Sequence, residues 1–263
     1  MFTYRLNWFV PLFLAAALAG CGSGNKPATE EKPSEGPTAA TAPAAAINPD
    51  TVGEITGTVA FDGQAPAKIR IRMDAVPACT EANKGQPVYA EEVEVNDNMT
   101  LKDVFVYVKD GLGNQSFPPP AEPVPLDQKG CWYHPHVIGI MAGQKLDVKN
   151  SDPTNHNIHP LPKDNREWNQ SQPPGAADLM QEFARPEVMI PVKCNVHPWM
   201  KSYIGVVSNP FFAVTDDKGS FTIKGLPPGD YTIEAWQEKY GTQDQKVTVG
   251  PKESKMVQFS YKG

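Results

Sequence analysis

Short strand-like runs separated by proline and glycine limit what this chain can fold into. It has 27 Pro and 21 Gly in 263 residues, and both residue types interrupt regular structure. Apolar residues follow one another or alternate over only three to five positions, as at residues 104–108, 137–140 and 146–148, which is typical of strands. Only residues 176–183 have helical character. We therefore predict an all-β protein, and the length allows one large domain or two modest ones.

The charge distribution limits the partners that the chain can bind. The net charge is −6, and the Lys and Arg residues are scattered rather than clustered. Because nucleic-acid-binding proteins present a basic stripe or patch, we expect no nucleic-acid partner.

The first twenty residues differ from the rest of the chain. Arg5 precedes an apolar stretch, residues 9–18, that is too short to span a bilayer. The stretch leads into Leu-Ala-Gly-Cys at positions 18–21. This resembles the lipobox of bacterial lipoproteins, which implies a signal peptide over residues 1–20 and a lipidated Cys21. An ordinary signal peptide that ends near a cysteine is the alternative.

The next segment, residues 21–50, is rich in Ala, Pro, Thr, Glu and Ser. It has too few large apolar side chains to form a core, so we predict a disordered tether. Acyl chains on Cys21 would then hold the protein on a membrane. Gly22 stands where an aspartate would signal retention in the inner membrane. By resemblance to that sorting rule, we expect an exported lipoprotein on the periplasmic side of the outer membrane or at the cell surface.

The C-terminal part has a pattern of its own. Positions 215–223 read T-D-D-K-G-S-F-T-I, and positions 226–233 read L-P-P-G-D-Y-T-I. This order resembles the carboxypeptidase regulatory-like, or transthyretin-like, family and implies a small Ig-like β-sandwich over residues 209–263. Residues 55–63 also resemble the first strand of that family, so residues 53–72 are candidates to pair with it. Whether the preceding domain, residues 51–208, is inserted in this sandwich stays open.

Two further segments contain residues of the types that bind metals. Positions 150–159 read N-S-D-P-T-N-H-N-I-H, and positions 194–200 read C-N-V-H-P-W-M. Together they resemble the cupredoxins, and the C-x-x-H-P-x-M loop is closest to that of amicyanin. The resemblance implies a cupredoxin-like Greek-key β-sandwich with one mononuclear type 1 copper. Its ligands would be His156, Cys194 and His197, with Met200 as the weak axial ligand.

The chemistry of these side chains supports copper independently of the family. A thiolate with two imidazoles selects copper, and a long thioether contact suits both of its oxidation states. Zinc is the main competitor, but zinc sites rarely contain methionine. Asn157 matches the family residue that ties the first ligand strand to the cysteine loop. Taken singly, Cys194 could be an inert buried thiol and Met200 a core residue.

Three cysteines remain once Cys21 is assigned to the lipid. An odd number in an exported protein means that at least one has a role other than disulfide formation. With Cys194 assigned to copper by resemblance, Cys79 and Cys131 are left as a candidate disulfide. Two buried, reduced thiols are the alternative.

Residue counts exclude several copper enzymes. The trinuclear cluster of multicopper oxidases needs more histidines than the five present. The binuclear centre of cytochrome oxidase needs a second cysteine in the loop. Polysaccharide monooxygenases need an N-terminal histidine, which a lipidated Cys21 would displace. For His134, His136 and His159 we expect surface or hydrogen-bonding roles.

Four protein ligands leave no open position for a substrate, so we expect an electron carrier and not an enzyme. In the family the edge of the second histidine is exposed, which implies electron exit at His197 with Pro198 and Trp199 in the surrounding patch. The partner would be a redox protein, such as a cytochrome or dehydrogenase, that docks weakly. Copper trafficking or storage is an alternative function. So is a cell-surface module that binds carbohydrate or protein, with Trp236 and Tyr240 as stacking candidates.

Overall fold

The computed structural model describes residues 47–263. The predicted signal peptide, the lipidated Cys21 and most of the tether lie outside the described residues, and residues 47–50 are exposed. The described part contains one short helix, α1 (Pro77–Ala82), and is otherwise built of strands. None of its helices is long and apolar enough to cross a membrane. The all-β prediction is confirmed.

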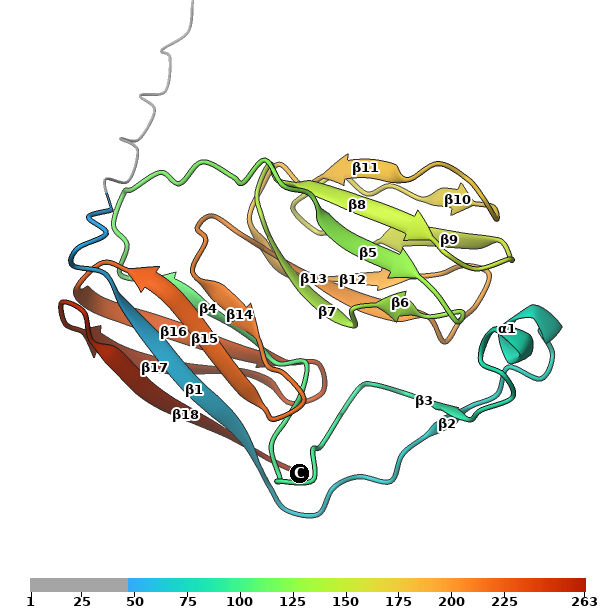
Figure 1. The fold of residues 1–263 in the computed structure, drawn as a ribbon, viewed down its shortest axis with the longest axis horizontal. Coiled ribbons are helices and arrows are strands. Elements are labelled where there is room, and N and C mark those ends of the chain that lie inside the picture. The colour runs from blue at the N-terminus through green and yellow to red at the C-terminus, as the bar shows by residue number, and fades with distance from the viewer. Residues whose placement is uncertain (1–46) are drawn as a thin grey trace, which may run out of the picture. The chain divides into compact units, whose positions relative to one another are not determined.

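The C-terminal strands belong to two sheets that enclose an apolar core (Figure 1). The three-stranded sheet has the order β15 (Ser220–Leu226), β1 (Gly53–Asp62) and β18 (Ser254–Lys262). The four-stranded sheet has the order β14 (Phe212–Val214), β4 (Phe105–Asp110), β16 (Gly229–Gln237) and β17 (Gly241–Val249). Every second residue of β1 is buried, as expected for a strand with one face on a core.

Two strands from the N-terminal half complete these sheets. β1 is antiparallel to β15 and parallel to β18. Of the candidate residues 53–72, residues 53–62 therefore pair with C-terminal strands, whereas residues 70–71 pair with residues 88–89. β4 was not expected in these sheets. A continuous apolar run such as residues 104–108 indicates burial without indicating the partner strand. The chain from β5 to β13 therefore lies, in sequence, between two strands of one sandwich.

That intervening stretch forms a second pair of sheets (Figure 1). The five-stranded sheet has the order β10 (Gln170–Gln172), β9 (His156–Pro160), β12 (Glu187–Lys193), β13 (Lys201–Val207) and β7 (Val137–Met141). The four-stranded sheet has the order β11 (Leu179–Glu182), β8 (Lys145–Asn150), β5 (Val124–Gln128) and β6 (Tyr133–His134). Their shared core includes Leu126, Leu146, Ile158 and Ile190.

The helical character of residues 176–183 is not realised. Residues 179–182 form β11, in which Leu179 pairs with Val148 and Glu182 with Lys145. A two-stranded ribbon, β2 (Arg70–Ile71) with β3 (Val88–Tyr89), flanks α1. We call residues 70–89 the cap segment, because it covers part of the site described below.

Phe105 of β4 packs against two glycines of the five-stranded sheet. A Cβ atom at Gly139 would lie 2.7 Å from the ring of Phe105, and one at Gly205 would lie 2.6 Å from it. These distances are shorter than any tolerated carbon–carbon contact, so only glycine permits this close approach of ring to strand.

His136, just before β7, is buried among acidic side chains. Its Nε2 lies 2.8 Å from Oε2 of Glu238, and its Nδ1 lies 3.4 Å from Oε2 of Glu91. The Tyr203 hydroxyl donates to the other oxygen of Glu238 at 2.9 Å. Burial lowers the pKa of His136, but the hydrogen bond to Glu238 and the charges of Glu238, Glu91 and Asp103 outweigh it, so the pKa is raised.

This raised pKa makes the contribution of His136 to stability depend on pH. The folded-state pKa exceeds the unfolded value of about 6.5, so the stabilisation is fully present below that pH and is lost as pH rises through the folded-state pKa. We expect His136→Gln to lower the free energy of unfolding by about 3 kcal/mol at acidic pH, as for a broken buried ion pair, and by less at alkaline pH. Urea unfolding at pH 6 and pH 9 measures this. The exposed His134→Gln is the control, and an equal loss at both pH values would contradict the assignment.

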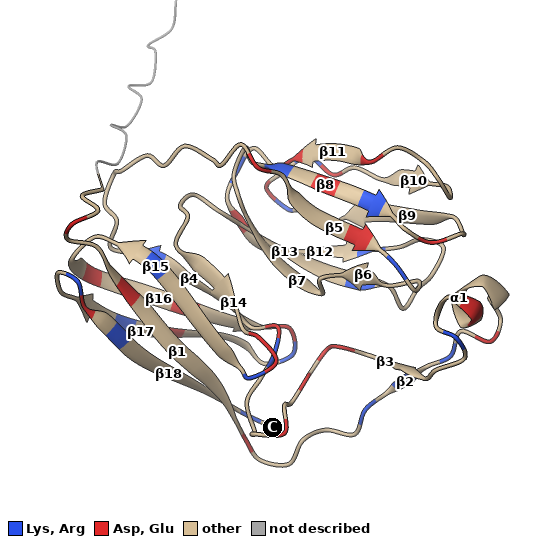
Figure 2. Ribbon diagram, in the orientation of Figure 1, with Lys and Arg blue, Asp and Glu red and all other residues tan. Residues whose placement is uncertain are grey.

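Charged residues are distributed without a basic stripe over the described residues. Figure 2 shows Lys and Arg interspersed with Asp and Glu on the strands of both sandwiches. The expectation of no nucleic-acid partner rests on this distribution and on the net charge of −6.

Candidate metal centre

The predicted ligands come from two neighbouring strands and the loop after one of them. His156 is the first residue of β9, and Cys194 directly follows β12. β9 and β12 are antiparallel partners, with His159 opposite Lys193. This pairing brings the start of one strand and the end of the other to the same region of the sheet.

The ligand loop, residues 194–200, is closed by its own backbone. The amide of Cys194 donates to the carbonyl of Met200 at 3.3 Å, and the amide of Met200 donates to the carbonyl of His197 at 3.0 Å. The amide of His197 also donates to the Cys194 sulfur at 3.4 Å. These bonds fix the positions of the loop's side chains before any metal binds.

Three donor atoms converge in the protein interior. Nδ1 of His156 lies 2.9 Å from Nδ1 of His197, and Sγ of Cys194 lies 3.9 Å from the same His197 atom. All three donors lie within 4.8 Å of one another, and all three residues are buried. Metal–nitrogen bonds are about 2.0 Å and metal–thiolate bonds about 2.3 Å, so one ion can reach all three. Met200, the fourth predicted ligand, is fully buried at the end of the same loop.

The surroundings favour the thiolate that a metal needs. Burial raises the pKa of Cys194, but hydrogen bonds from the His156 ring and from the amides of His197, Asn157 and Val196 outweigh burial and lower that pKa. Burial and the nearby charge of His156 lower the pKa of His197, which favours a neutral ring with a free lone pair. A deprotonated sulfur and neutral imidazoles are the forms that coordinate metals. Burial lowers the pKa of His156, but its hydrogen bonds to Asp152 and Cys194 outweigh burial and raise that pKa, so a metal ion would have to displace a proton from this ring.

Asp152 orients the first histidine. Its Oδ2 lies 2.8 Å from Nε2 of His156, and its two oxygens accept hydrogen bonds from the amides of Gly130 and Cys131, both at 2.7 Å. Burial raises the pKa of Asp152, but these bonds outweigh it and lower that pKa. When Nε2–H donates to the carboxylate, the lone pair of Nδ1 points at His197. Sequence reasoning missed Asp152, although its position four residues before His156 was a signal.

We expect Asp152→Asn to weaken metal binding by about 10- to 100-fold, the usual effect of losing a carboxylate that orients a metal-binding histidine. The amide cannot accept from both backbone amides and from His156 at once. Competition with a chromophoric chelator measures the affinity. Asp127→Asn is the matched control on β5, since Asp127 contacts Ser151 and not the ligands. Equal affinities for the two variants would contradict the role of Asp152.

Asn157 ties the two ligand segments together. Its Oδ1 accepts from the amide of Asn195 at 2.5 Å, and its Nδ2 donates to Oδ1 of Asn169. The side chain thus links β9 to the loop residue that follows Cys194, which is the tie that the family resemblance implies.

The predicted disulfide is confirmed. Cys79 in α1 is bonded to Cys131, 52 residues away. The sulfur of Cys79 lies 3.6 Å from Nε2 of His197, and the indole of Trp199 donates to the carbonyl of Cys131 at 3.1 Å. The disulfide therefore covers the edge of His197 that points away from the other ligands.

Because the disulfide covers His197, the ring edge of this residue is not the exposed exit for electrons that we expected. His197 is only 1% exposed, whereas the family resemblance implied an exposed edge. The cap segment precedes the ligand loop by more than a hundred residues, so no feature of the loop indicates it. Of the two predicted patch residues, Pro198 is exposed and Trp199 is half-buried. Their neighbour Val196 is 48% exposed.

The remaining histidines and aromatic candidates lie outside this cluster. His134 is exposed and contacts the carbonyl of Lys129. His159 contacts Glu167 through Nε2 at 2.5 Å and Asn195 through Nδ1 at 3.2 Å. The two candidates for sugar stacking pack against other aromatic rings, Trp236 against Tyr203 and Tyr240 against Phe61 and Tyr261.

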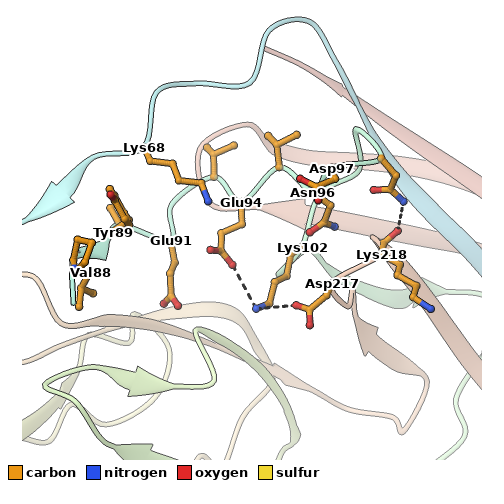
Figure 3. Close-up of a pocket in the computed structure, with 15 residues that line it drawn as sticks. Lys68, Val88, Tyr89, Glu91, Glu94, Asn96, Asp97, Lys102, Asp217 and Lys218 are labelled. Carbon is orange, nitrogen blue, oxygen red and sulfur yellow. Dashed lines mark hydrogen bonds and ion pairs between the residues drawn. The ribbon is translucent and has the colours of Figure 1, made fainter. Parts of the chain in front are cut away.

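A polar pocket of about 680 Å³ lies near the cap segment, away from the ligands (Figure 3). In it, Lys102 forms ion pairs with Glu94 at 3.5 Å and with Asp217 at 3.1 Å. Lys68 and Glu91 also line the pocket. Positive and negative side chains are mixed there, so the pocket favours no ligand of one charge.

Comparison with known proteins finds both resemblances again. The Carboxypeptidase regulatory-like domain family matches residues 206–262. No curated protein matches the chain.

Similar solved structures include copper proteins. A Cu-containing nitrite reductase from Thermus scotoductus is 19% identical, with a TM-score of 0.31 over 37% of this chain and 25% of that one. A Cu(I) amicyanin variant is 16% identical, with a TM-score of 0.28 over 32% of this chain and 81% of that one. A purple cupredoxin from Nitrosopumilus maritimus is 20% identical, with a TM-score of 0.25 over 28% and 81%. The chain spans a quarter of the length of the nitrite reductase.

Proposed function

We propose that this protein binds one type 1 copper ion through His156, Cys194, His197 and Met200 and carries single electrons. The observation behind the proposal is the convergence of two Nδ1 atoms and one thiolate within 4.8 Å in a buried site. One soft sulfur with two imidazoles is the donor set of blue copper sites. Bound copper would supply a one-electron couple between Cu(I) and Cu(II).

The side chains around the ligands would keep the site rigid during electron transfer. Asp152 holds one imidazole, Asn157 ties the strand to the loop, and backbone hydrogen bonds close the loop. A site held in this way changes little in geometry between oxidation states, so the barrier to electron transfer is low. With four ligands from the protein, a substrate has no position to occupy. We therefore propose a carrier and not an enzyme.

The exposed part of the ligand loop is our proposed docking point for a redox partner. Val196 and Pro198 flank His197 in sequence and reach solvent. Redox encounters use small, weak interfaces, and the partner we propose is a cytochrome or a dehydrogenase. We retain the proposal that the chain is an exported lipoprotein held on a membrane through Cys21.

Burial of the site favours electron transfer over copper trafficking. The three ligands that converge are at most 3% exposed, and the disulfide lies over one of them. A metal ion held so deeply should exchange slowly, whereas an electron needs no open path.

Stopped-flow mixing with a reduced c-type cytochrome tests the proposal. The copper-loaded protein should oxidise the haem in a second-order reaction, while copper should pass to a chelator orders of magnitude more slowly. The zinc-loaded protein is the control, because zinc has no accessible redox change. Rapid loss of copper to the chelator without haem oxidation would favour trafficking instead.

A further inference from the structure

A second set of donor atoms lies on the far side of His197. Sγ of Cys79, Sγ of Cys131 and a ring nitrogen of His197 lie within 4.8 Å of one another, and all three residues are buried. Nδ1 of the ring faces His156, whereas Nε2 faces the sulfur of Cys79 at 3.6 Å. Among the described residues, that sulfur is the only hydrogen-bonding partner of Nε2. The imidazole thus presents one nitrogen to each of two donor sets.

The two cysteines are held together by contacts other than the disulfide. Nδ2 of Asn83 donates to the carbonyls of Cys79 and Gly130, both at 2.8 Å. Asp152 accepts from the amides of Gly130 and Cys131. These bonds join α1 to the Cys131 turn without using sulfur, so the two thiols should stay side by side after the disulfide is broken.

We propose that the reduced Cys79 and Cys131, with Nε2 of His197, form a second metal site that takes Cu(I). Two thiolates and one imidazole suit a soft monovalent ion with few ligands. The disulfide keeps this site closed, and its reduction opens it. Each sulfur then gains a metal-binding lone pair that the S–S bond had used.

The chemistry needs an external dithiol, such as that of an exported thiol–disulfide oxidoreductase. The dithiol gives two electrons and two protons to the Cys79–Cys131 bond and itself becomes a disulfide. Binding of Cu(I) then displaces the two thiol protons. While the first site is empty, the proton of the His197 ring can stay on Nδ1, which leaves Nε2 free to coordinate.

The test uses the full chain carrying Cys194→Ser, which removes the thiolate of the first site. Protein with its disulfide intact is compared with protein reduced by a phosphine that is then removed without oxygen. Cu(I) is titrated in competition with bicinchoninate, and X-ray absorption counts the sulfur ligands. We expect no Cu(I) retained by the oxidised form and one Cu(I) per chain in the reduced form, with two sulfur ligands and at least one nitrogen.

The control adds Cys79→Ser and Cys131→Ser to the same chain, which should then retain no Cu(I) in either state. If Cys194→Ser does not fold, Cys194→Ala takes its place, and the same difference between its oxidised and reduced forms is expected. An unchanged stoichiometry on reduction, or a reduced-form site without two sulfur ligands, would overturn the proposal. Binding by the oxidised wild type reports separately on the first site.

Discussion

Replacing Cys194 with serine should abolish the absorption near ~600 nm of the copper-loaded protein and weaken copper binding by more than about 100-fold. The thiolate is the only anionic donor among the proposed ligands, and the intense colour of such sites depends on the copper–thiolate bond. Losing a direct ligand should weaken copper binding by more than the 10- to 100-fold caused by losing a residue that orients a ligand. Titration with Cu(II), followed by optical spectroscopy and chelator competition, measures both quantities.

The same substitution should leave the fold intact. Serine has nearly the shape of cysteine, and its hydroxyl can replace the sulfur in the contacts with His197, so we expect a change of about 1 kcal/mol in the free energy of unfolding without metal. Circular dichroism and urea unfolding of the metal-free protein check this. An intense blue colour that survives in folded Cys194→Ser protein would show that another group supplies the sulfur.

Removing the disulfide with Cys79→Ser and Cys131→Ser should lower the free energy of unfolding by about 2–4 kcal/mol. The bond closes a loop over a separation of 52 residues, and a cross-link of that span restricts the unfolded chain strongly. Urea unfolding of the variant, compared with oxidised wild type, gives the value.

The effect should come from the bond itself and not from a change in packing. Wild-type protein reduced with a phosphine is therefore the control, and it should lose a similar amount of stability. A loss below about 1 kcal/mol in both forms would contradict the expectation that this cross-link stabilises the fold by restricting the unfolded chain.

The sequence identified those candidate ligands that lie close together along the chain. Cys194, His197 and Met200 lie within seven positions, so their loop is visible without knowledge of the fold. His156 lies far from them in sequence but is marked by the asparagine that follows it. Strands such as β7 and β8 were also predictable, because alternation and turn residues are local signals.

Features that depend on distant segments could not be predicted in this way. The run at residues 104–108 is apolar throughout, and nothing in it identifies β16 as its neighbour. The cap segment carries no motif, and its contact with His197 follows from the position of Cys79 in the folded chain. Asp152 was overlooked because acidic residues are common in turns. Its role depends on hydrogen bonds with Gly130, Cys131 and His156, which come together only in the folded chain.

The optical and EPR spectra of the full chain after addition of one equivalent of Cu(II) test the central assignment most directly. If His156, Cys194 and His197 hold the ion together, the protein should become intensely blue, show the narrow copper hyperfine splitting of a type 1 site, and lose its colour with ascorbate. A colourless copper-loaded protein with the wide splitting of ordinary square-planar Cu(II) would contradict the assignment.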